Sequence, residues 1–122
     1  MKNEVYLATH DCVSDPMPRK CTVINRVQKR SGSGECVLVK VSPPLPTAFQ
    51  GGPIQEFDRI VLAFLGGRTI GDVGSGDVVV DIVVCPGYAG GFLDEPACSR
   101  MGTGSLHATY EEALQASPLE KR

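Results

Sequence analysis

Acid–base chemistry in this chain depends on two histidines and a few aspartates. His10 lies two residues before Cys12, a spacing that puts both side chains on one face of a strand and would allow a thiolate–imidazole pair. A solitary histidine and a buried, inert thiol are the commoner outcome. Asp81 is a charge inside an otherwise apolar run, so it must face water, a partner or a pocket. His10 and Asp81 are therefore the candidate catalytic residues, with a carboxylate at 94–95 as the group that would act with either.

The sequence favours neither a metal site nor a cofactor. The five cysteines lie far apart, without a close pair of the kind that structural zinc sites use. His10, Asp11, Asp15 and His107 could meet at a mixed-ligand metal ion, but both aspartates are equally suited to a turn beside a proline. In the glycine-rich stretch 66–76, an aspartate stands where a phosphate-binding loop has lysine, and the glycine spacing does not match a dinucleotide site. We therefore predict no metal and no cofactor.

The preferred ligand-binding region is a long loop predicted over residues 86–107. This segment shows no hydrophobic periodicity and is rich in glycine, and it is long for a structureless loop in a compact domain. Binding loops combine apolar anchors with polar groups. The candidate ligand-binding residues are Tyr88, Phe92, Asp94, Glu95 and Arg100. The alternative is that the two aromatic side chains simply pack against the edge of the core.

Three prolines predict a second loop, over residues 42–57. Pro43, Pro44 and Pro46 have no N–H to donate to a sheet ladder, and each biases the residue before it to an extended geometry. We therefore expect the chain to leave the sheet after Val41.

These features predict a binding or interaction module that uses the loops 42–57 and 86–107. No set of side chains combines a nucleophile, a base and an orienting group at credible positions, so an enzyme is the less favoured class. The alternative is a small-molecule enzyme whose carboxylate and histidine groups converge in a pocket only in three dimensions. A third hypothesis is a homodimer through an edge strand, because the apolar, β-prone windows 59–65 and 78–84 would favour pairing if left exposed.

Composition narrows the partners and the location. The 12 basic and 14 acidic side chains give a net charge of -2, which produces no field that would attract nucleic acid. The longest apolar run, 60–67, is far shorter than the ~20 residues that span a bilayer, and an acidic residue near the N-terminus interrupts any signal-peptide pattern. The odd number of cysteines fits reduced thiols. We therefore expect a small soluble cytoplasmic protein with a small-molecule or protein partner, and neither nucleic-acid nor membrane binding.

Period-two alternation is the main structural signal in the chain. Short runs rich in β-branched residues, separated by glycine- and proline-rich turns, predict strands at 5–9, 21–27, 36–41, 60–65, 68–73 and 77–85. A helix is the alternative over 54–65, because the apolar residues there also recur near helical spacing. Thr109 and Glu112 have the spacing of a capping box, which predicts one short helix after them.

The fold class that follows is mainly β (α+β). We expect an antiparallel sheet of five to six strands forming a small barrel or sandwich, with one short C-terminal helix. A chain of 122 residues, 42% of them hydrophobic, is enough for one core. We place this single domain at 1–117 and expect a mobile tail at 118–122, after Ser117 and Pro118 end the helix.

Overall fold

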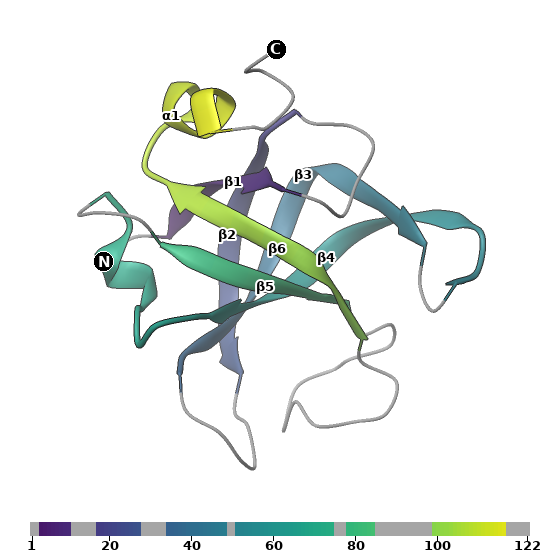
Figure 1. Ribbon diagram of the computed structural model, residues 1–122, viewed down its shortest axis with the longest axis horizontal. Helices are drawn as coiled ribbons and strands as arrows, with labels where there is room; N and C mark the ends of the chain where they lie inside the picture. Colours follow the sequence, from purple (N-terminus) through teal and green to yellow (C-terminus); the bar gives the residue numbers. More distant parts are fainter. Residues whose placement is uncertain are drawn as a thin grey trace.

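The computed structural model describes residues 3–10, 17–27, 34–48, 51–74, 78–84 and 99–116. These residues form a closed antiparallel barrel in which each strand pairs with the next and the last pairs with the first (Figure 1). The predicted antiparallel sheet with one short C-terminal helix is confirmed, and the sheet takes the form of a barrel. The elements are β1 (Glu4–Thr9), β2 (Arg19–Val27), β3 (Cys36–Ala48), β4 (Ile54–Phe64), β5 (Val79–Val84), β6 (Ser99–His107) and α1 (Tyr110–Ala116).

Apolar side chains from the inner faces of the strands fill the barrel. On β5, Val80, Ile82 and Val84 are buried, and the residues between them point outward and are more exposed. The same alternation on the other strands places a set of fully buried residues inside: Val5, Leu7, Val37, Val39, Val41, Ile60, Leu62, Phe64 and Leu106. Side chains can fill a barrel of about eight strands, so this narrower one has a packed interior.

Closure of the sheet pairs both of the apolar windows from which the edge-strand dimer was predicted. The windows 59–65 and 78–84 fall mainly in β4 and β5, and each of these strands is hydrogen-bonded to a neighbour on both sides. Neither window therefore offers an open edge to a second copy. The homodimer through an edge strand stays a prediction.

β3 continues through its three prolines, so the predicted loop over 42–57 is wrong. Only the residues between Ala48 and Ile54 separate β3 from β4. The pairing of β2 with β3 extends to Ser42, and beyond that residue the described pairing of β3 is with β4, in an irregular register. A proline whose missing N–H would face away from the partner strand costs no ladder hydrogen bond. The prolines therefore lie in a two-stranded extension of the barrel.

β6 covers residues that we expected to be part of the loop 86–107, so that expectation is wrong for 99–107. The inward positions of β6 are Gly102, Gly104 and Leu106, which face Ile82, Val80 or Leu7 on the adjoining strands. Glycine carries no hydrophobic signal, so a strand with glycine at its inward positions shows no apolar alternation. The remaining part of the expected loop, 86–98, lies outside the described residues.

The structure also decides two further local predictions, for residues 54–65 and 68–73. Residues 54–64 are β4, so the helix alternative over 54–65 is wrong. The strand expected over 68–73 is also wrong, because Ile70–Asp72 form a short 3-10 helix. The backbone N–H of Thr69 donates a 2.8 Å hydrogen bond to Asp72 Oδ2, which caps this turn. Ile70 and Val73 are buried in the main core, so the turn is anchored to the barrel.

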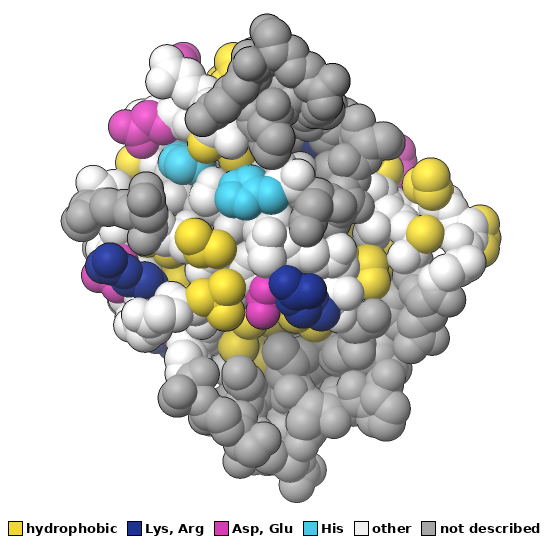
Figure 2. All heavy atoms as spheres, viewed as in Figure 1, with side chains coloured by type: hydrophobic (Ala, Val, Ile, Leu, Met, Phe, Trp, Pro, Cys, Tyr) yellow, Lys and Arg dark blue, Asp and Glu magenta, His cyan; other side chains and the backbone are white. Residues whose placement is uncertain are grey.

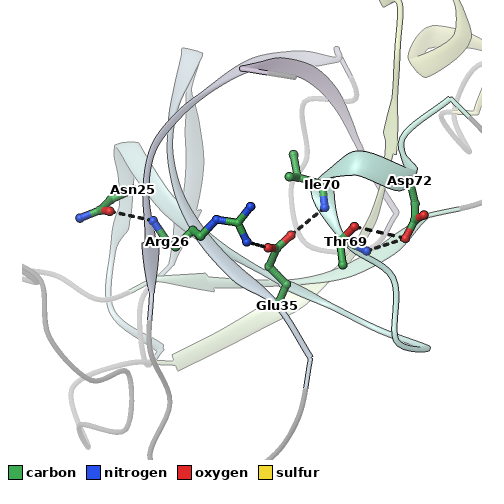
Figure 3. Close-up of polar contacts among 6 residues, drawn as sticks. All are labelled: Asn25, Arg26, Glu35, Thr69, Ile70 and Asp72. Atoms are coloured by element: carbon green, nitrogen blue, oxygen red, sulfur yellow. Dashed lines mark hydrogen bonds and ion pairs between the residues drawn. The ribbon is translucent and has the colours of Figure 1, made fainter. Parts of the chain in front are cut away.

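The carboxylate of Glu35 fastens this 3-10 helix to the hairpin of β2 and β3 (Figure 3). Its Oε1 accepts a 2.7 Å hydrogen bond from the backbone N–H of Ile70. Its Oε2 forms an ion pair with the guanidinium of Arg26 on β2. The Glu35 side chain is 10% exposed, whereas that of Arg26 is 64% exposed, so the contact with Ile70 is the more shielded from water. One carboxylate therefore joins the β2–β3 hairpin to a 3-10 helix that lies 35 residues further along the chain.

Helix α1 packs against β1 and β6 and begins at the predicted cap. Thr109 Oγ1 accepts a 3.2 Å hydrogen bond from the N–H of Glu112, as expected of an N-cap threonine. The rings of Tyr6 and Tyr110 meet edge to face with centroids 6.3 Å apart, and Ala113 is fully buried. Within the described residues, neither this helix nor any other has the length and apolarity to cross a membrane.

Candidate binding site on the outer face of the barrel

Both histidines lie on one outer face of the barrel and are joined through a serine. The distance from His10 Nε2 to Ser105 Oγ is 3.2 Å, and that from Ser105 Oγ to His107 Nε2 is 2.7 Å. Figure 2 shows the two imidazoles close together, beside apolar side chains. His10 is exposed, His107 is half-buried and Ser105 is buried. The three groups form a hydrogen-bond chain that reaches solvent.

Strand register sets the positions of these three side chains. Ser105 and His107 are two residues apart on β6, so they share its outer face, while Leu106 between them is buried in the core. On β1, Ala8 pairs with Ser105, and the N–H of His10 donates a 3.0 Å hydrogen bond to the carbonyl of Thr103. The hydrogen-bond chain is therefore positioned by the backbone pairing of β1 with β6 and by the burial of Leu106 in the core.

The serine hydroxyl imposes an order on the two imidazoles. It carries one proton, so it can donate to only one neutral ring, and the other ring must donate its Nε2–H to Ser105 Oγ. When both rings are neutral, they are therefore held in different tautomers. At the Nδ1 atoms, one ring is then a hydrogen-bond donor and the other an acceptor.

A second polar group lies on the neighbouring strand. Arg100 Nε donates a 2.8 Å hydrogen bond to Asp81 Oδ1, and the two side chains are 57% and 23% exposed. Asp81 on β5 is paired in register with Thr103 on β6. This position explains the charge within an apolar strand, because the side chain points outward toward a cationic partner. An exposed ion pair of this kind contributes roughly 0–1 kcal/mol to stability, so it orders the surface more than it stabilises the fold.

Three of the sequence-predicted site residues thus come together around Thr103. His10 follows β1 and donates its N–H to the carbonyl of Thr103, Asp81 on β5 is paired with Thr103, and Arg100 precedes Thr103 on β6. His10 and Asp81 are two strand spacings apart, about 10 Å between their backbones, which is too far for direct proton transfer.

The other predicted ligand residues, Tyr88, Phe92, Asp94 and Glu95, lie outside the described residues. The enzyme alternative requires a carboxylate from 94–95, so it stays a prediction. Sequence reasoning noted His107 only in passing and missed Ser105. The alternation of outward polar residues in 103–107 is the signal that could have found them.

Comparisons of the chain with protein-family models, with curated proteins and with solved structures gave no match. The case for this site therefore depends on its geometry alone.

The thiol of Cys21 is excluded as a nucleophile. Cys21 is fully buried in the core, and burial raises the pKa of its thiol from 9.0 to about 12, although the nearby Arg19 acts in the opposite direction. The thiolate is the reactive form, so this side chain is inert at neutral pH. Cys36 is also buried, at 3% exposed.

This shift predicts a loss of stability at alkaline pH. The folded-state pKa of Cys21 lies above the ordinary value, so its contribution is complete below pH 9.0 and is lost as the pH rises toward about 12. Relative to a Cys21→Ala variant, the free energy of unfolding of the wild type should fall by about 1.4 kcal/mol between pH 7 and pH 10. Urea unfolding of both proteins at the two pH values measures this difference. An identical pH dependence would mean that the buried thiol titrates normally.

Proposed function

We propose that this protein is a binding module that takes its ligand on the outer face of β5, β6 and β1. The observation that carries the proposal is the placement of the His10–Ser105–His107 chain and the Asp81–Arg100 pair on one face, around Thr103. Each polar group is oriented by a hydrogen bond before a ligand arrives, which lowers the entropic cost of binding.

The packed interior supports an external site. The inward positions of the described strands are taken mainly by apolar side chains and glycine. A buried exception is Arg19 on β2, whose guanidinium donates hydrogen bonds to the backbone carbonyls of Met17 and Pro44. The outer face instead combines an acidic, a basic and two imidazole groups with Val79, which is 36% exposed. Small-molecule sites typically pair a few placed polar groups with apolar contact area.

The ligand class follows from these groups and their spacing. The face carries donors and acceptors of both charges, and three adjacent strands span about 10 Å. A small molecule with hydrogen-bonding groups at both ends and an apolar middle matches that surface. The same features would also accept a short segment of a protein partner. The ligand proposed here is a small molecule, so the test uses small molecules of this type.

The test is a titration of ¹⁵N-labelled protein with a fragment set of aromatic carboxylic acids, amides and amines. Binding fragments should shift the amide signals of 79–83, 100–107 and 6–10. Arg100→Ala and Ser105→Ala should each weaken binding by about tenfold, the effect of losing one positioned polar contact. Arg59→Ala is the matched control, because Arg59 is an exposed arginine on β4, opposite Lys40.

Two outcomes would contradict the proposal. One is the absence of any fragment that shifts this face at millimolar concentration. The other is an equal loss of affinity in Arg100→Ala and Arg59→Ala, since a general charge effect would then explain binding.

A further inference from the structure

The two imidazoles converge on one point. His10 Nε2 and His107 Nε2 are both directed at Ser105 Oγ, at 3.2 and 2.7 Å. They reach this oxygen from adjacent strands whose pairing is continuous from Tyr6 to Thr9. Two imidazole Nε2 atoms are thus held on either side of a single small group on the surface. The ring that donates to Ser105 offers a lone pair there once its proton moves to Nδ1.

This arrangement has the chemistry of a transition-metal site. Neutral imidazole is a common ligand of Zn²⁺, Cu²⁺ and Ni²⁺, with metal–nitrogen distances of about 2.0–2.1 Å. Nitrogen ligands of a tetrahedral ion at that distance lie about 3.4 Å apart. The rings can approach each other by side-chain rotation, because His10 is exposed and, among the described residues, its ring is hydrogen-bonded to Ser105.

The charged side chains on this face do not disfavour a bound cation. The guanidinium of Arg100 is neutralised by Asp81 at 2.8 Å, which reduces its repulsion of a positive ion on the same face. The described residues contain no cluster of three or more His, Cys, Asp or Glu side chains. Within that part of the chain the site therefore has two protein ligands, and water would complete the coordination shell, as in an open metal site.

We propose that His10 and His107 bind one divalent transition-metal ion of the zinc class through their Nε2 atoms. The metal takes the place that the Ser105 hydroxyl occupies between the two rings. The donor set is two imidazole nitrogens without a carboxylate, so the site discriminates against Mg²⁺ and Ca²⁺, which prefer oxygen ligands. This proposal does not depend on the small-molecule binding proposed above, because it requires only the two histidines.

The test is calorimetric titration of the full chain with ZnCl₂ and NiCl₂, with MgCl₂ and CaCl₂ as controls. One Zn²⁺ should bind per chain, and neither control ion should bind. His10→Gln and His107→Gln, which keep a polar side chain of similar size, should each lower the Zn²⁺ affinity at least tenfold. Ser105→Ala should retain binding, because the hydroxyl supplies no required ligand.

A second readout locates the ion. Substoichiometric Ni²⁺ should broaden the imidazole NMR signals of both histidines in the wild type. The proposal is overturned if both glutamine variants bind Zn²⁺ as tightly as the wild type, which would place the ion on other side chains. It is equally overturned if only one imidazole broadens. Fragment binding measured with a chelator present tests the proposed function separately.

Discussion

A Gly104→Ala variant should lose about 3 kcal/mol of unfolding free energy or more, the upper range for overpacking a core. A Cβ at this position would lie 2.7 Å from the backbone oxygen of Ala8 and 2.9 Å from Leu7 Cδ1. Ile82 Cδ1 would lie at 3.3 Å. The oxygen belongs to β1, whose pairing with β6 closes the barrel, so it cannot move away without disturbing that ladder. The substitution therefore destabilises the pairing of β1 with β6, which closes the barrel.

Gly71→Ala is the control for this prediction. The nearest heavy atom to a Cβ at Gly71 is Thr69 Oγ1 at 3.6 Å, an ordinary contact, and its backbone is not in the left-handed region. Urea unfolding should place this variant within about 0.5 kcal/mol of the wild type. If Gly104→Ala were equally well tolerated, the close approach of β1 and β6 would be incorrect.

Glu35→Ala should cost about 2–3 kcal/mol of unfolding free energy. The substitution removes the acceptor of the Ile70 N–H and the ionic partner of Arg26, in a place where the glutamate side chain is only 10% exposed. A backbone donor that loses its partner out of water costs about 1–3 kcal/mol. Glu35→Gln should cost about 1 kcal/mol, because the amide oxygen can still accept from Ile70 while the charge is lost.

The matched control is a glutamate in an exposed ion pair. Glu4 lies 3.2 Å from Lys20, and their side chains are 52% and 46% exposed. Glu4→Ala should change stability by no more than about 0.5 kcal/mol in urea unfolding. Equal losses in Glu35→Ala and Glu4→Ala would show that Glu35 does not connect the 3-10 helix to the barrel.

Local patterning was sufficient to predict most strands. β5 carries an uninterrupted alternation, and the hairpin of β2 and β3 has the expected glycine-rich connection and antiparallel pairing. The cap at Thr109 was predicted because it depends on residues only three positions apart. These features are local, so a single sequence contains the information that determines them.

The misplaced segments depend on the neighbouring strand. Pro43 and Pro44 are tolerated because β2 ends its pairing at Ser42, which cannot be known before the register is known. Gly104 occupies an inward position because side chains from two other strands fill its place. Val27 has the same parity in the sequence as Cys21 and Val23, but a register shift in β2 places it in a separate apolar cluster with Cys36.

In the candidate site, too, the residue types could be selected from the sequence, but their arrangement depends on strand pairing. His10, Asp81 and Arg100 were each selected for their residue type, but nothing local indicated that they share a face. Their proximity follows from the pairing of β1 and β5 with β6, a contact between segments more than ninety residues apart for β1. Ser105 was not selected because a serine gains its significance only when both imidazoles are placed beside it.

We propose that this protein binds its ligand on the outer face of β5, β6 and β1. The most direct test is the amide shift map of ¹⁵N-labelled protein with the tightest-binding polar fragment, in the wild type and in Ser105→Ala. The account predicts shifts confined to 79–83, 100–107 and 6–10, with an affinity about tenfold weaker in the variant. Shifts centred on the outer faces of β3 and β4, with the same affinity in both proteins, would contradict it.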